Sequence, residues 1–163
     1  MNYKKISKCR ICKSDKIKKI LDLGDQAFTG KFPTSYKKNI SKSPLSISLC
    51  LKCKFVQLSH NFSSSYLYNQ EYGYESGINS TMKNHLFKIT QKVAALKKLT
   101  KSSIVVDIAS NDGTLLNSYN KDIIKVGIDP ILNKFKDKYK KINHKVSDFF
   151  SYKNFKKLNL KKK

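Results

Sequence analysis

Apolar and polar residues follow a strand, loop and helix order along residues 105–128. A mostly apolar, β-branched run at 105–108 precedes Ala-Ser-Asn-Asp-Gly, and leucines follow at 115 and 116. A buried parallel strand, a tight loop and the start of a helix have this pattern. A second apolar run at 123–128 ends in Asp129, so we expect two parallel strands whose carboxyl ends carry the loop and this acid.

The region that begins at Asn79 has a helical period. Its apolar residues recur at spacings of four and three and form one stripe: Met82, Leu86, Ile89, Val93 and Leu96. Asn79 or Ser80 suits the N-cap of this helix. His85 lies one residue from the centre of the stripe, and this position predicts a partly buried structural histidine.

Shorter runs predict the remaining elements. Residues 18–24 indicate a strand that ends at Gly24, and the alternation at 44–50 and 55–58 indicates a hairpin whose turn holds a cysteine pair. Residues 131–139 predict a lysine-rich helix, and residues 145–150 the start or the replacement of a third parallel strand.

All four cysteines lie in two C-x-x-C pairs, Cys9/Cys12 and Cys50/Cys53. Two such knuckles can place four thiolates around Zn²⁺, and a site closed by four thiolates makes the metal structural. The interval between the pairs exceeds the ~15 to 20 residues of a compact zinc ribbon, so an insertion is expected. Disulfides or unrelated thiols are the alternatives. No run of ~20 apolar residues predicts a membrane span, and the first residues lack a secretory pattern. We therefore expect a reducing cytoplasm, which favours metal over disulfides.

The formal charge of +23 comes almost entirely from lysine, with Arg10 as the single arginine. A codon bias toward A and T would give this composition without selecting a partner. Nucleic-acid readers commonly use arginine for bidentate contacts, and the lysines are spread along the whole chain. A zinc-ribbon protein that binds nucleic acid is therefore the less favoured alternative.

The residue types after the two main strands suit a nucleoside. Small residues in the loop let backbone N–H groups approach a ligand, Gly113 can adopt a positive φ, and Asp129 can accept hydrogen bonds from two vicinal hydroxyls. Neither G-x-G-x-x-G nor a Lys-Ser/Thr P-loop is present. An adenosine ligand without phosphates therefore fits better than a phosphorylated one.

The stretches Asp-Ile-Ala-Ser-Asn-Asp-Gly-Thr-Leu-Leu from Asp107 and Val-Gly-Ile-Asp-Pro from Val126 resemble motif I and the acid after the second strand of S-adenosylmethionine (SAM)-dependent methyltransferases. In particular, they resemble sugar C-methyltransferases that carry an N-terminal zinc-binding domain. Leu-Gly-Asp-Gln-Ala from Leu23, Pro-Leu from Pro44 and Val-Gln-Leu from Val56 resemble that zinc domain. The resemblance thus covers the whole chain.

The resemblance implies which residues contact SAM and the acceptor. The implied SAM-binding residues are Asp107, Ala109, Asn111, Asp112, Gly113, Asp129 and Asp148, with alanine at 109 where the family often has glycine. The stretch Tyr-Gly-Tyr-x-Ser-Gly-x-Asn-x-x-Met-x-x-His resembles the part that packs over the active site, which makes Tyr72, Tyr74 and His85 pocket candidates. A packed linker between domains is the alternative for the aromatic segment. The family methylates a carbon of a nucleotide-linked keto sugar after a base removes the adjacent proton.

The expected fold class is α/β: a small zinc-ribbon-like module at 1–64, an aromatic loop and linking helix at 65–100, and the first part of a Rossmann-like SAM-binding domain at 101–163. A complete sheet of this family has about seven strands, and each parallel crossover needs a dozen or more residues. We therefore expect an N-terminal fragment or shortened product that is inactive alone, because the general base lies further along. A non-catalytic subunit whose sheet is completed by a second chain is the other alternative.

Overall fold

The computed structural model of the chain describes residues 3–28, 30, 32–33, 35–36, 39–120 and 122–160. The chain forms two compact units, Met1–Gly73 and Tyr74–Lys163, which divide inside the aromatic segment. The first unit consists mainly of strands, and strands and helices alternate from β6 onward, so the α/β class is confirmed at the level of a mixed α/β chain. In the described residues, no helix has both the length and the apolar character that a bilayer crossing requires.

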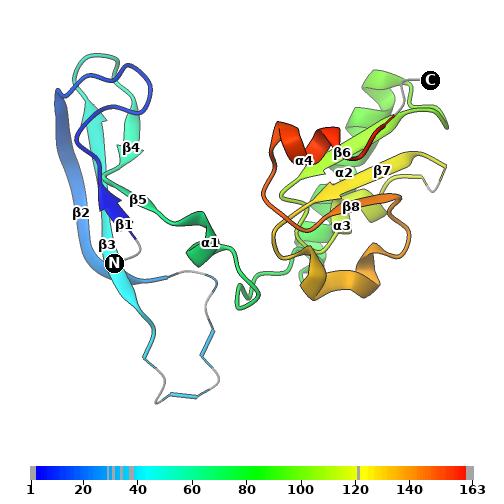
Figure 1. Cartoon of the computed structure of the whole chain (residues 1–163), viewed down its shortest axis with the longest axis horizontal. Helices are drawn as coiled ribbons and strands as arrows, with labels where there is room; N and C mark the ends of the chain where they lie inside the picture. The colour runs from blue at the N-terminus through cyan, green and yellow to red at the C-terminus, as the bar shows by residue number, and fades with distance from the viewer. Residues whose placement is uncertain are drawn as a thin grey trace. The chain divides into compact units, whose positions relative to one another are not determined.

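The first unit contains two small antiparallel sheets (Figure 1). In one sheet, β3 (Lys42–Cys50) lies between β2 (Ile17–Ala27) and β4 (Val56–Leu58). In the other, β1 (Tyr3–Lys5) pairs with β5 (His60–Phe62). A single turn of helix, α1, follows over Ser64–Leu67.

The predicted hairpin is confirmed, because Leu49 of β3 lies opposite Val56 of β4 and the connecting turn contains the second cysteine pair. The predicted end of the preceding strand at Gly24 is wrong, since β2 continues beyond it. The pairing shifts register between Asp22 and Asp25, and Gly24 has a φ of 65°. The glycine therefore makes a β-bulge, which bends a strand without ending it.

The interior of the first unit is polar. The buried polar side chains come from β3, β4 and the residue after β4: Ser43, Ser46, Ser48, Gln57 and Ser59. Among the described residues of this unit, the buried hydrophobic side chains are Cys9 and Cys50. Since β2 is exposed along almost its whole length, apolar burial contributes little to this unit.

The second unit is built on a parallel sheet of β6 (Ile104–Ile108), β7 (Ile124–Ile128) and β8 (His144–Val146) (Figure 1). The two strands predicted from the apolar runs are confirmed as β6 and β7. Ile108 lies opposite Ile128, which lies opposite Val146. The carboxyl ends of all three strands therefore meet at one edge of the sheet.

Helix α2 (Ser80–Lys97) begins as predicted, because the Asn79 side chain accepts hydrogen bonds from the backbone N–H groups of Thr81 and Met82. The predicted apolar stripe is wrong at its C-terminal end, since Leu96 is 80% exposed. The expected partial burial of His85 is also wrong, since this side chain is exposed. The helix packs against α3, and Thr90 is its buried residue.

The lysine-rich helix predicted at 131–139 forms as a 3₁₀ helix, η1 (Leu132–Tyr139), with a kink at Phe135. The kink lets Leu132, Phe135 and Tyr139 all point into the core. Two short helices complete the unit, α3 (Thr114–Asn117) and α4 (Tyr152–Lys156). The core contains aromatic and aliphatic side chains from these elements: Leu116, Tyr119, Ile123, Val126, Ile128, Ile131, Leu132, Phe135, Tyr139 and Ile142.

One charged side chain is buried in the central strand. Lys125 of β7 is 2% exposed, and its Nζ donates a hydrogen bond of 2.9 Å to the carbonyl oxygen of Tyr119. Burial lowers the pKa of this amine, and the charge of Lys141 lowers it further.

Candidate functional site

Two knuckles bring the four cysteines of the first unit together. The first follows β1, and the second is the turn between β3 and β4. All four Sγ atoms lie within 4.8 Å of one another, and the four cysteines are free. The Sγ atoms of Cys9 and Cys53 are 3.6 Å apart, as are those of Cys12 and Cys50.

These distances fit a tetrahedral zinc ion. Four ligands at a Zn–S distance of about 2.3 Å would lie about 3.8 Å from one another. A disulfide needs its two sulfurs at about 2.05 Å, far closer than either pair. Four sulfur donors in a closed set suit Zn²⁺ as a structural ion. The cysteines at 9, 12, 50 and 53 are therefore the residues that would hold it.

The knuckle backbones favour thiolate sulfurs. The amide of Cys53 donates to Cys50 Sγ at 3.5 Å and is the main cause that lowers the pKa of Cys50 to about 6. The amide of Cys12 acts in the same way to lower the pKa of Cys9. For Cys53, the amide of Phe55 lowers the pKa, but burial and the neighbouring thiols outweigh it and raise the value to about 12. A metal cation would displace the protons that remain on these thiols when it binds.

Arg10 was not predicted as a functional residue, yet it ties the first knuckle to the strands. Its guanidinium donates to the carbonyl oxygens of Leu58 and His60 and to Asn61 Oδ1, at 2.9, 3.2 and 2.7 Å. Its backbone amide donates to Gln57 Oε1 at 2.9 Å. The sequence signal was its position as the single arginine, inside the first cysteine pair.

In the second unit, the loop between β6 and α3 is strained. Three of its five residues have a positive φ: Ala109 at 61°, Asn111 at 49° and Gly113 at 74°. L-residues disfavour this region, and such conformations gather at functional sites. The backbone N–H of Ala109 donates to the carbonyl oxygen of Ile128 at 2.9 Å, so the loop is tied to the end of β7.

The structure brings Asp129 to this loop. Its Oδ2 accepts the backbone N–H of Asn111 at 2.8 Å, and its Oδ1 accepts that of Ile131, also at 2.8 Å. The carboxylate is buried, with 5% of the residue exposed. Asp107 lies close enough to Asp129 for their charges to interact, and burial together with that charge raises the pKa of Asp107 to about 6.

Tyr139 supports the loop, a role that no sequence pattern indicated. Its hydroxyl lies 2.8 Å from Ser110 Oγ and donates to the carbonyl oxygen of Asn111 at 2.8 Å. Burial is the main cause that raises the pKa of this phenol, and the charges of Asp129, Asp107 and Asp112 raise it further. Tyr139 is therefore a neutral donor held under an acidic loop.

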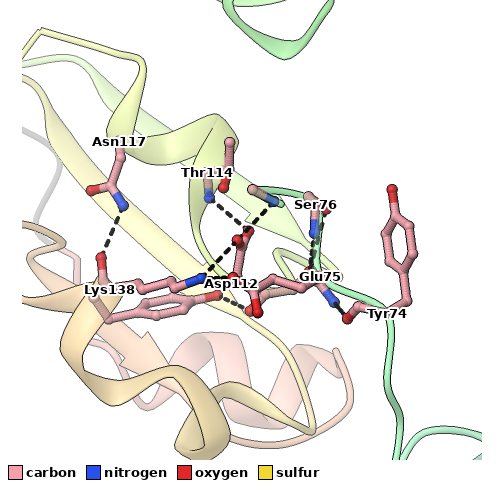
Figure 2. A network of polar contacts seen from close by, with 10 residues as sticks. Tyr74, Glu75, Ser76, Asp112, Thr114, Asn117 and Lys138 are labelled. Carbon is pink, nitrogen blue, oxygen red and sulfur yellow. Dashed lines mark hydrogen bonds and ion pairs between the residues drawn. The ribbon is translucent and has the colours of Figure 1, made fainter. Parts of the chain in front are cut away.

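The start of the second unit docks onto the same loop (Figure 2). Residues 74–77 form hydrogen bonds with the side chains of Asn111 and Asp112. A cavity of about 480 Å³ adjoins them, lined by Gly77, Lys83, Asn84, Phe87, Asp112, Thr114, Asn117, Ser118 and Lys138. The loop thus contacts both this cavity and residues 74–77.

The remaining predicted site residues are Tyr72, Tyr74, His85 and Asp148. Tyr72 belongs to the first unit, where its ring packs against Gly30. Tyr74 is the first residue of the second unit. His85 is exposed on α2, and Asp148 is exposed beyond β8, where it accepts hydrogen bonds from Phe149 and Asn154. Their roles in binding stay predictions.

Residues 9–68 match a family model that is named for methyltransferases and is described as "Putative zinc binding domain". The matched range contains both cysteine pairs and the strands that carry them. The predicted N-terminal zinc-binding module is therefore confirmed, and it is a module associated with methyltransferases. Among curated proteins, none matches the chain.

Proposed function

From the methyltransferase-associated zinc domain at residues 9–68, we propose that the chain belongs to a SAM-dependent C-methyltransferase that acts on a nucleotide-linked keto sugar. Zinc holds the first unit together, and the loop between β6 and α3 binds SAM. When bound, SAM supplies an electrophilic methyl group on a sulfonium. The contribution of the described residues is to bind and orient this group and to exclude water from it.

The observation that carries the proposal is the acidic character of the loop in a strongly basic chain. Asp107 and Asp129 lie close enough for their charges to interact, and Asp112 belongs to the loop whose backbone Asp129 accepts a hydrogen bond from. The chain as a whole has a formal charge of +23. A cluster of carboxylates repels phosphates and attracts cations, and SAM carries both a sulfonium and an ammonium group.

The positions of Asp129 and the loop support an adenosyl ligand. Each oxygen of the Asp129 carboxylate accepts one backbone N–H and retains a second lone pair for a ribose hydroxyl. The pKa of Asp107 is raised to about 6, so this acid is mostly charged at neutral pH. In the proposed function, Ala109 and Gly113 keep the backbone free of bulky side chains where the ligand approaches.

Calorimetric titration tests this proposal directly. We expect SAM and S-adenosylhomocysteine to bind the zinc-loaded chain and ATP to bind at least tenfold more weakly, because its phosphates meet the carboxylates. Asp129→Asn should weaken SAM binding about tenfold or more, since a hydrogen bond to a charged group contributes about 1.5–3 kcal/mol. Asp137→Asn is the control: it changes an acid on η1 whose side chain is 91% exposed, and it should leave SAM affinity unchanged. Failure of SAM to bind, or equal affinity for ATP, would refute the proposal.

We also propose that a second chain completes the sheet at β6. Ile104, Val106 and Ile108 share one face of this strand and are 37%, 37% and 53% exposed. Apolar residues in a parallel sheet are usually covered on both faces. Ultracentrifugation tests this proposal. The chain should self-associate, and Val106→Lys should abolish the association because it would bury a charge in the contact.

A further inference from the structure

The loop between β6 and α3 holds residues 74–77 by their backbone (Figure 2). The Asn111 side chain accepts the backbone N–H of Ser76 at 2.9 Å and donates to the carbonyl oxygen of Tyr74 at 3.1 Å. Asp112 Oδ2 accepts the backbone N–H of Gly77 at 2.9 Å. Because these contacts use main-chain groups, they fix the path of the segment, and the Ser76 hydroxyl adds a hydrogen bond of 3.3 Å to Asn111 Oδ1.

An ionic contact closes the same arrangement. Lys138 pairs with Glu75 of the segment and lies 3.6 Å from Asp112 Oδ2. The Asp112 side chain is fully buried, and its Oδ1 accepts the backbone N–H of Thr114 at 3.1 Å. A buried carboxylate needs such partners, so undocking the segment would leave Asp112 with one partner fewer.

The fit at Gly77 leaves no spare room. A Cβ atom at this position would lie 2.5 Å from Asp112 Oδ2 and 2.6 Å from Thr114 Oγ1. The φ of Gly77 is not positive, so steric contact alone makes glycine necessary here. A single methyl group can therefore push the segment off the loop without changing a loop residue.

Tyr74 stands at the end of this docked segment. Its carbonyl oxygen faces Asn111, while its ring points away from the polar cluster (Figure 2). The backbone contacts with the loop thus fix the position of the Tyr74 ring. A tyrosine ring offers a flat apolar face and a polar tip, which suit contact with a small polar ligand.

We infer that Asn111 and Asp112 are positioning residues, which fix Tyr74 by holding the backbone of residues 74–77 on the loop. This inference rests on the proposed function, in which the same loop binds SAM. Docking and SAM binding both require the loop in its left-handed conformation, so each stabilises the other. Coupling of this kind is reciprocal: SAM tightens the docked segment, and undocking weakens SAM by the same factor.

Hydrogen exchange of the Ser76 and Gly77 amides measures docking, because these N–H groups donate to the loop side chains. SAM at saturation, checked by calorimetry, should slow exchange at both amides by about fivefold or more. If SAM binds but leaves their exchange unchanged, the inference is wrong and the proposed function stands. If SAM does not bind at all, the proposed function fails, and the inference fails with it.

Two variants test the reciprocal effect. Gly77→Ala should speed exchange at Ser76 and weaken SAM binding about fivefold or more. Lys138→Met should also speed exchange at Ser76, whereas Lys136→Met, which changes an exposed lysine of the same helix, should leave it unchanged; SAM affinity is compared for Gly77→Ala, which keeps every charge. Unaltered exchange at Val126 of β7 shows that each variant is folded. Faster exchange at Ser76 with unchanged SAM affinity in a folded variant would overturn the inference.

Discussion

Replacing Ala109 by glycine should stabilise the second unit. Ala109 has a φ of 61°, and its side chain is exposed, so the methyl group contributes strain and little packing. The left-handed conformation costs an L-residue about 1–2 kcal/mol, and a more flexible unfolded chain costs glycine about 0.4–1 kcal/mol. The net gain should be about 0.5–1 kcal/mol. The hydrogen bond from residue 109 to the carbonyl oxygen of Ile128 is kept.

The assay must report on the second unit alone. Exchange of the β7 amides, read by mass spectrometry of peptides covering Ile124–Ile128, reports its unfolding, and a gain of this size slows exchange about two- to fivefold. Ala95→Gly is the matched control, because Ala95 lies exposed within α2. There the same chemical change should cost about 1 kcal/mol, since glycine is a poor helix former.

The two substitutions should therefore have opposite signs. If Ala109→Gly leaves exchange unchanged or faster while Ala95→Gly destabilises as expected, residue 109 is not strained, and the left-handed loop would have to be given up. If both variants stabilise the second unit, or both destabilise it, effects on the unfolded chain outweigh the strain at residue 109, and the reasoning also fails.

Three further predictions concern other parts of the chain. Chelation of zinc should speed amide exchange in β3 at least a hundredfold and leave β7 unchanged, because the described part of the first unit buries hardly any apolar side chains and structural zinc contributes many kcal/mol to small domains. Gly127→Ala should destabilise the second unit by about 1–3 kcal/mol in urea titration, since a Cβ would lie 2.7 Å from Tyr139 Cε1; an unchanged midpoint would contradict this packing. Asp107→Asn should stabilise the protein at pH 7 by about 2 kcal/mol, with no gain below pH 4. The folded pKa of Asp107 is raised, so the wild type loses stability as pH rises from about 4 to 6 and the variant does not; a pH-independent difference between the two would show that Asp107 is not the cause.

The parts of the fold that follow from local pattern could be predicted from the sequence. The β-branched runs gave β6 and β7, and the position of Asp129 at the end of β7 brought it to the loop because parallel strands end at the same edge. The two C-x-x-C pairs indicated the metal centre because they contain all four cysteines at the spacing of zinc knuckles. In each case, the residue types and their spacing along the chain were enough to predict the structure.

The misses came from interactions between distant residues. Gly24 indicated the end of a strand, but pairing with β3 on both sides of it made a bulge instead. The lysine-rich pattern of η1 indicated a helix but neither its 3₁₀ form nor its kink at Phe135. The contacts of Asn111 and Asp112 with residues 74–77 join positions some 35 apart in the sequence, so no local pattern predicts them.

The burial of Lys125 has a practical consequence. Lysine and arginine together make up 34 residues of the chain, Arg10 being the single arginine, and in the described part Lys125 is the one lysine that is buried. An acylating reagent will modify the exposed ε-amines quickly and will reach Lys125 only when the sheet around it opens. The extent of acylation at this residue therefore records, in a single mass spectrum, how often the second unit unfolds.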